Sequence, residues 1–134
     1  MAASFWRLAV RSEFSASHAL RHYQGKCENP HGHNFSVEAV VQGHLLSEDT
    51  ELLADFSLLK HDLKTVLDTL DHKDLNSIPP FDRINPSSEN LSRHIYRALA
   101  PLVARHGVRM HSVAVGEKSA QSAAYFEAVE IVSG

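Results

Sequence analysis

Cysteine is scarce in this chain of 134 residues, which contains Cys27 and no second one. A lone cysteine cannot form a disulfide within the chain, which excludes a small disulfide-stapled secreted fold. A chain of this length can bury a hydrophobic core without disulfides or a structural metal. We therefore expect one domain over residues 1–134 and a reducing, cytoplasmic environment.

Long apolar runs and an excess of basic residues are also lacking. The longest apolar run is a few residues, and the first residues do not combine a basic segment with an apolar stretch as a signal peptide does. Lysine and arginine number 13 against 16 acidic residues, a net charge of −3, so the sequence has no basic field for nucleic acid. We expect neither a membrane nor a nucleic-acid partner.

Alternating polarity predicts the strands, and no internal repeat or low-complexity stretch interrupts the chain. Apolar and polar residues alternate with a period of two over residues 5–15, 33–43, 109–117 and 124–132. His31 and His33 should lie at the entrance of the second of these strands, facing the same side as Phe35.

Apolar residues at helical spacing predict two helices between the strand pairs. Asp55 can cap the first helix, which should end near Asp71. The second should start at Ser87 or Ser88, and Pro101 should kink or break it. The order strand, strand, helix, helix, strand, strand predicts an α+β fold with both helices on one face of an antiparallel sheet.

Histidine is abundant, with ten in the chain, and three of them suggest a metal site. His31 and His33 are separated by one glycine, so in an extended backbone their rings leave the same face about 6 to 7 Å apart. His18 offers a third ligand. Three histidines without a fourth protein ligand are typical of a catalytic zinc site that keeps one position open for water or substrate.

Cys27 lies between these histidines in a polar run and has two metal-linked alternatives. As a fourth ligand it would close the site and make it structural. Outside the coordination sphere, it could act as a thiolate base or nucleophile, favoured by a metal and by the nearby Lys26 and His22.

Other polar groups have weaker claims when judged by spacing alone. Asp71 and His72 could form a carboxylate-oriented proton-transfer pair, although such neighbours also cap helix ends. Glu117 ends a predicted strand, where a solvated side chain is common. Arg21 and Lys26 form a basic loop face that could receive an anionic tail such as a phosphate chain.

Five sequence blocks together resemble a known family. They are Phe14-Ser15-Ala16-Ser17-His18, Cys27-x-x-x-His31-Gly32-His33-Asn34, Leu70-Asp71-His72-Lys73-x-Leu75-Asn76, Asn85-Pro86-Ser87-Ser88-Glu89-Asn90 and Glu117. In this order they resemble the 6-pyruvoyl-tetrahydropterin synthase and 6-carboxy-tetrahydropterin synthase family. The resemblance implies the tunnelling fold, in which each ββααββ subunit adds four strands to a trimeric barrel and two trimers commonly stack into a hexamer.

The resemblance also implies roles for the candidate residues. Zn²⁺ would be held by His18, His31 and His33. Proton transfer would fall to Cys27, Asp71 and His72, the last two reaching the site from a neighbouring subunit. The substrate's pterin ring would be anchored by Glu117, beside the hydroxyls of Ser87 and Ser88.

Within the family the spacing between the cysteine and the first histidine separates subgroups. The pyruvoyl enzymes resemble Cys-x5-His-Gly-His and the carboxy enzymes Cys-x3-His-Gly-His, and this chain has Cys-x3. The resemblance therefore favours conversion of 7,8-dihydroneopterin triphosphate into 6-carboxy-5,6,7,8-tetrahydropterin, acetaldehyde and triphosphate. Pyruvoyl-tetrahydropterin formation is the alternative. A non-catalytic zinc or pterin-binding module is the alternative of another class.

Overall fold

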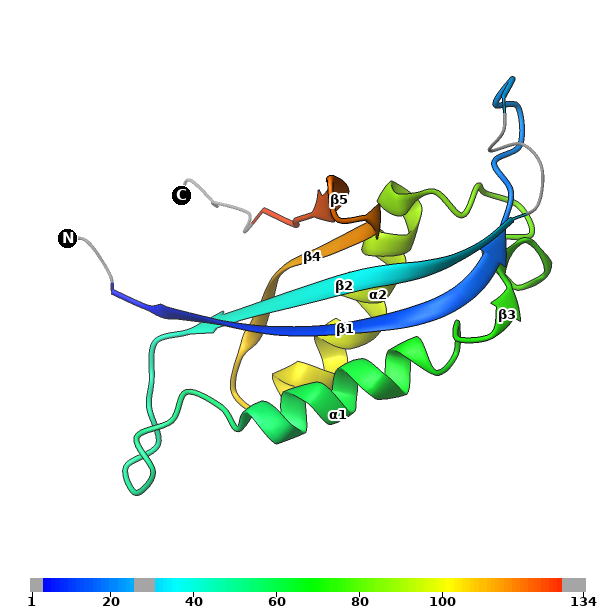
Figure 1. Ribbon diagram of the computed structural model, residues 1–134. Coiled ribbons are helices and arrows are strands. Elements are labelled where there is room, and N and C mark those ends of the chain that lie inside the picture. Colours follow the sequence, from blue (N-terminus) through cyan, green and yellow to red (C-terminus); the bar gives the residue numbers. More distant parts are fainter. Residues whose placement is uncertain (1–3, 26–30, 129–134) are drawn as a thin grey trace.

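The computed structural model describes residues 4–25 and 31–128 (Figure 1). Its elements in chain order are β1 (Trp6–His18), β2 (His31–Gly43), α1 (Phe56–Leu67), β3 (Lys73–Asp74), a 3₁₀ turn η2 (Leu75–Ser77), α2 (Ser88–Ala104), β4 (Arg109–Lys118) and β5 (Gln121–Tyr125). No helix in the described ranges is long and apolar enough to cross a membrane.

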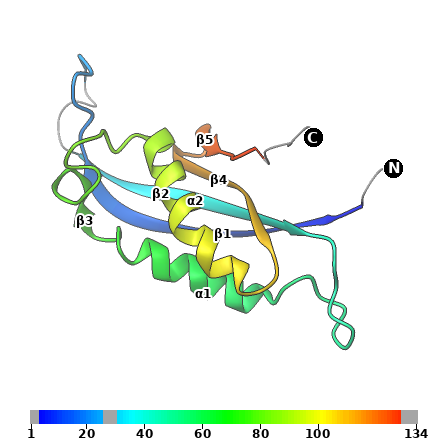
Figure 2. The ribbon, with the colours of Figure 1, turned by 180° about the vertical axis from the view of Figure 1, so that it is seen from behind.

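The strands form one open sheet in the order β3-β1-β2-β4-β5. Both helices cover the same face of this sheet: α2 lies behind β2 and β4 in Figure 1 and in front of them in Figure 2, where the molecule is turned by 180°. The expected α+β arrangement with helices on one face is therefore confirmed. No helix of the described residues covers the opposite face of the sheet.

The β1–β2 hairpin is the longest paired unit, with all 13 residues of β1 in register with β2. Its alternating sequence sends one set of side chains toward the helices, where Phe14, Phe35 and Val37 are at most 2% exposed. The Phe14 and Phe35 rings stack with their centroids 4.9 Å apart. This packing fixes which face of the hairpin is buried, and with it the face on which the terminal histidines lie.

The helices begin where capping side chains predict. Asp55 accepts a hydrogen bond from the Ser57 backbone N–H at 2.8 Å, and Ser87 accepts one from Asn90 at 3.1 Å. Leu91 and Ile95 of α2 are fully buried against the sheet. Because Ser87 is the N-cap of α2, the beginning of this helix is fixed beside the end of β1 through the neighbouring residue Pro86.

The structure corrects the predicted strands in two places. β3 is an additional strand that pairs in parallel with β1 at Ala16 and Ser17, so the sheet is neither four-stranded nor wholly antiparallel. The last strand begins at Gln121 rather than Ala124, because Gln121 already pairs with Lys118 of β4. Residues 126–128 form no strand, and positions 129–132 of the prediction lie outside the described residues.

The helices also differ from their predicted limits. α1 ends at Leu67, and the chain then winds through turns in which the Thr69 and Leu70 N–H groups bond to carbonyls three residues back. Of the kink or break expected near Pro101, the break does not occur: α2 continues past this residue to Ala104. Pro101 lies in the last helical turn, where few backbone bonds follow it, and Leu99 and Val103 anchor that turn in the core.

Candidate metal centre and adjoining pocket

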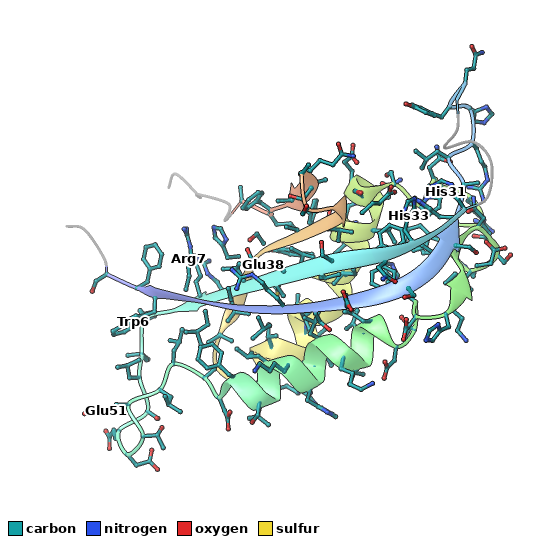
Figure 3. The ribbon with its side chains drawn as sticks, viewed as in Figure 1. Trp6, Arg7, His31, His33, Glu38 and Glu51 are labelled. Atoms are coloured by element: carbon teal, nitrogen blue, oxygen red, sulfur yellow. The ribbon has the colours of Figure 1, made fainter. Side chains whose placement is uncertain are left out.

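Three histidines converge where β1 ends and β2 begins. His18 is the register partner of His31, and His33 pairs with Ala16. All three histidine side chains therefore project from the face of the sheet that the helices cover. The ring centroids are 4.5 Å apart for His18 and His31, 4.5 Å for His31 and His33, and 5.4 Å for His18 and His33. Figure 3 shows His31 and His33 together at the start of β2. The predicted cluster is thus brought together, and it lies on paired strands rather than in a loop.

His18 is held in a fixed orientation at the centre of this cluster. Its side chain is 1% exposed, and its ring packs edge-on against Phe35 with centroids 5.0 Å apart. Its Nδ1 lies 2.9 Å from the Pro86 carbonyl, to which an Nδ1–H donates. Burial lowers the pKa of His18 below its ordinary value, against the opposing effects of the Pro86 carbonyl and the Glu117 carboxylate. The neutral tautomer that fits this environment carries its lone pair on Nε2.

Glu117 joins the histidines from a bulge near the end of β4. Val115 pairs with Ala123 and Lys118 with Gln121, so Gly116 and Glu117 face the single residue Ser122 of β5. Bulges redirect side chains. Here the Glu117 Oε1 lies 2.9 Å from His18 Nε2, and its Oε2 lies 3.3 Å from His33 Nε2.

The donor atoms fit a metal ion. One ligand atom from each of His18, His31, His33 and Glu117 lies within 4.8 Å of the others. Among the described residues, the buried His18 Nε2 has no hydrogen-bond partner, although a carboxylate oxygen is 2.9 Å away. Two lone pairs facing each other at this distance repel, unless a positive charge lies between them. Three imidazole nitrogens and one carboxylate are a donor set that suits Zn²⁺.

A pocket of about 520 Å³ adjoins the group on the side of Glu117. Its polar lining comes from Ser87, Ser88, Glu89, Glu117, Gln121 and Ser122, and its apolar lining includes Leu20 and Tyr23. The volume is within the range of small-molecule sites, and polar groups on an apolar background are typical of them. The structure therefore places Ser87, Ser88 and Glu117 around one pocket, and Gln121 and Ser122 are lining residues that the sequence did not identify.

Two asparagines hold the backbone that follows His18, and neither was singled out from the sequence as a site residue. The Asn76 side chain accepts from the Ala19 N–H at 2.8 Å and donates to the Ala19 carbonyl at 2.9 Å. Asn85 makes the same pair of bonds with Arg21, at 2.8 and 2.9 Å. Each amide thus replaces a strand partner for one residue. Both asparagines lie in sequence blocks that carry the family resemblance, which was the available signal, but their partners depend on the fold.

Arg21 uses its guanidinium within the chain. It donates to the carbonyls of Phe81 at 2.7 Å, Ile84 at 3.2 Å and Asn76 at 3.3 Å. These bonds fasten the segment after His18 to the loop that precedes α2. The anion-binding role stays a prediction for Arg21. For Lys26 it lies outside the described residues, as do the roles expected of Cys27.

Asp71 and His72 lie on the outer edge of β1, away from the pocket within this chain. Asp71 Oδ1 accepts from the Ser15 N–H at 2.9 Å, and the His72 N–H donates to the Ser15 carbonyl at 2.6 Å. The His72 ring is 82% exposed, with Nε2 at 3.6 Å from Asp71 Oδ2. His72 has a φ of 57°, a left-handed conformation that is uncommon for residues other than glycine and that clusters at functional sites. An exposed imidazole held in this way is available to a neighbouring molecule.

The fold and the site define a class: α+β proteins with a three-histidine, one-carboxylate group at the end of an open sheet, beside a pocket for a small molecule. Within that class, the chain belongs to the 6-pyruvoyl tetrahydropterin synthase family, whose family model matches residues 7–128.

Two curated relatives carry different names. The chain is 33% identical to the 6-carboxy-5,6,7,8-tetrahydropterin synthase of Synechocystis over 126 residues, which cover 90% of this chain and 93% of that protein. It is 38% identical to the 6-pyruvoyl tetrahydrobiopterin synthase of Dictyostelium discoideum over 106 residues, covering 70% and 78% of the two chains. The resemblance to this family is therefore confirmed, and the two names leave the product open.

A solved structure confirms the tunnelling fold. The 6-pyruvoyl tetrahydropterin synthase of Caenorhabditis elegans superposes with a TM-score of 0.82, covering 94% of this chain and 98% of that one, at 24% identity. The sheet of a single chain is open in the described residues, so it is not a barrel by itself.

Proposed function

We propose that the protein is a zinc-dependent 6-carboxy-5,6,7,8-tetrahydropterin synthase. It converts 7,8-dihydroneopterin triphosphate into the carboxypterin, acetaldehyde and triphosphate, a step of queuosine-type deazapurine synthesis in the cytoplasm. The Cys-x3-His spacing and the Synechocystis relative support the carboxy product.

The observation that carries this proposal is the position of Glu117. Its carboxylate contacts two histidines of the candidate metal group and also lines the 520 Å³ pocket. A pterin ring presents an amino group and a ring N–H side by side, which is the donor pair that one carboxylate binds with two parallel hydrogen bonds. A ring anchored at this carboxylate has its side chain within reach of the histidines.

Zn²⁺ would be held by His18, His31 and His33 and, when bound, would supply Lewis-acid stabilisation of charge on the oxygens of the substrate's side chain. The chain's own groups do the rest. The Pro86 carbonyl keeps the His18 Nε2 lone pair directed into the site. Ser87 and Ser88 present hydroxyls beside the ring, and Leu20 and Tyr23 offer it apolar contacts.

Proton transfer belongs, in this proposal, to Cys27 on one face of the substrate and to His72 on the other. Cys27 as thiolate removes or returns a proton at the side chain. His72, with its ring next to the Asp71 carboxylate, serves from a second subunit. Arg21 and Lys26 are the proposed contacts of the triphosphate.

Self-association as a trimer, with two trimers in a hexamer, completes the proposal. β3 covers only Ala16 and Ser17 of β1, and in the described part of the chain the edge from Trp6 to Phe14 has no strand beside it. Exposed edges of this length readily accept a strand from another chain. His72 lies on that same edge, so a neighbour that pairs there would meet its ring. Native mass spectrometry tests this: monomers alone would contradict it.

One assay decides the function. Purified zinc-loaded protein is incubated with 7,8-dihydroneopterin triphosphate, and acetaldehyde, triphosphate and pterin products are quantified. We expect acetaldehyde and triphosphate in equal amounts together with the carboxypterin. Unchanged substrate would overturn the enzyme proposal in favour of a non-catalytic zinc or pterin-binding module.

The second candidate is 6-pyruvoyl-tetrahydropterin synthase, which the 38% identity to the Dictyostelium protein favours. The two activities share triphosphate elimination and differ in whether a carbon–carbon bond breaks. Triphosphate without acetaldehyde, together with pyruvoyl-tetrahydropterin, would select this candidate.

A further inference from the structure

Glu117 lies between two possible partners, the histidine group and a pterin ring in the pocket. The proposed function assigns it to the pterin ring, yet in the structure both of its oxygens face histidine nitrogens, at 2.9 Å for His18 and 3.3 Å for His33. A bidentate donor pair approaches a carboxylate from this same side. The ring and the histidine group therefore compete for Glu117.

The buried His18 Nε2 indicates what lies between the histidines and Glu117 in the resting protein. No group in residues 4–25 and 31–128 forms a hydrogen bond with this nitrogen, and the Pro86 carbonyl fixes its ring, so the nitrogen stays directed at the carboxylate. A dication there would meet three imidazole nitrogens and one carboxylate. A carboxylate ligand is an established fourth donor for zinc, and it would remove one unit of the ion's charge in a partly buried site.

The pocket offers the carboxylate a second position. Glu117 is a lining residue of the 520 Å³ pocket, and its side chain is 18% exposed. It extends from a bulge, where the strand ladder does not restrain the residue on both sides. A rotation about its side-chain bonds is enough to move the carboxylate from the histidines toward a ring in the pocket.

We propose that Glu117 alternates between these partners: it is the fourth ligand of the metal in the resting protein, and the pterin ring draws it away, so that the metal's fourth position opens only when substrate is present. This inference rests on the proposed function, and it deepens it by assigning to one residue the coupling between ring binding and metal opening. A resting site closed in this way keeps stray anions off the metal.

Cobalt-substituted protein tests the exchange without any turnover. Co²⁺ reports its ligand set through its visible absorption, and unsubstituted pterin is the probe because it has the amino and ring N–H edge but no side-chain hydroxyls that could bind the metal. The variants are Glu117→Gln, which keeps the shape of the side chain, and the control Glu89→Gln, which removes the other carboxylate of the same pocket.

We expect the wild-type and Glu89→Gln spectra to coincide and the Glu117→Gln spectrum to differ before pterin is added. Saturating pterin should then shift the wild-type spectrum and leave that of Glu117→Gln unchanged. In a chelator competition, Glu117→Gln should bind Zn²⁺ about 10- to 100-fold more weakly than the wild type, the loss typical of a residue that supports a metal site.

Coincident cobalt spectra of the wild type and Glu117→Gln would overturn the proposal, since Glu117 would then not be a ligand. A wild-type spectrum that stays constant while pterin fluorescence shows binding would also overturn it, since the ring would then bind without moving Glu117. Pterin that fails to bind at all would remove the exchange and would also count against the proposed function. Failure of the proposed function is recognised separately from failure of the exchange: zinc-loaded wild-type protein would then form no product, whatever the cobalt spectra show.

Discussion

Replacing Asn76 by alanine should lower both the stability of the protein and its zinc affinity, although Asn76 is not one of the candidate metal ligands. The Asn76 amide makes both hydrogen bonds available to the Ala19 backbone, at 2.8 and 2.9 Å, and Ala19 follows the buried His18 directly. Alanine removes both bonds and leaves a part-buried N–H and carbonyl without partners. At about 1 to 1.5 kcal/mol for each bond, the free energy of unfolding should fall by about 2 to 3 kcal/mol.

The measurement is urea unfolding of the metal-free protein, paired with zinc competition against a chromophoric chelator. Because Asn76 supports the backbone of His18 rather than binding metal, zinc affinity should fall about tenfold, within the range found for groups that orient a ligand. Asn34→Ala is the matched control. Its exposed side chain accepts a hydrogen bond from the Ser15 hydroxyl, and the loss of this bond should cost less than about 0.5 kcal/mol. Equal effects of the two substitutions would refute the reasoning.

Three further predictions concern other parts of the molecule. Burial against Phe81, at 5.1 Å between ring centroids, lowers the pKa of His94. Between that lowered pKa and about 6.5 the unfolded chain therefore binds a proton that the folded protein does not. The free energy of unfolding is therefore unaffected above about pH 6.5. As the pH is lowered through this window, it decreases by up to about 1.4 kcal/mol per pH unit. Urea unfolding between pH 5 and 7 should show a shallower fall for His94→Gln, and parallel curves would contradict it. Cys27→Ala should retain zinc while kcat falls by about 10² to 10⁴, the range for a proton-transfer group; loss of stoichiometric zinc would show that the thiol is a ligand. Mixed oligomers of Cys27→Ala and His72→Ala chains should regain activity that neither variant has alone, and mixtures that stay inactive would contradict a site shared between subunits.

The hairpin that carries the histidines could be predicted because each strand has one buried face. Phe35 and Val37 recur with a period of two and fix the face on which His31 and His33 lie. The helix caps Asp55 and Ser87 could also be predicted, because a capping oxygen bonds to a backbone N–H only two or three residues further along the chain.

Features that depend on pairing between distant segments could not be predicted. β3 is two polar residues, Lys73 and Asp74, with no periodicity to detect. The bulge that turns Glu117 toward His18 arises from the register of β4 against β5, which no local pattern encodes. The role expected of Glu117 rests on the family resemblance alone, whereas its contact with the histidines is visible only in the fold.

The metal content of the purified protein tests the central claim most directly. After dialysis against trace zinc, mass spectrometry of the metal should find about one zinc per chain in the wild type and close to none in His33→Ala, while His44→Ala, a histidine outside the group, keeps about one. Zinc that is absent from the wild type, or that stays fully bound in His33→Ala, would contradict the account.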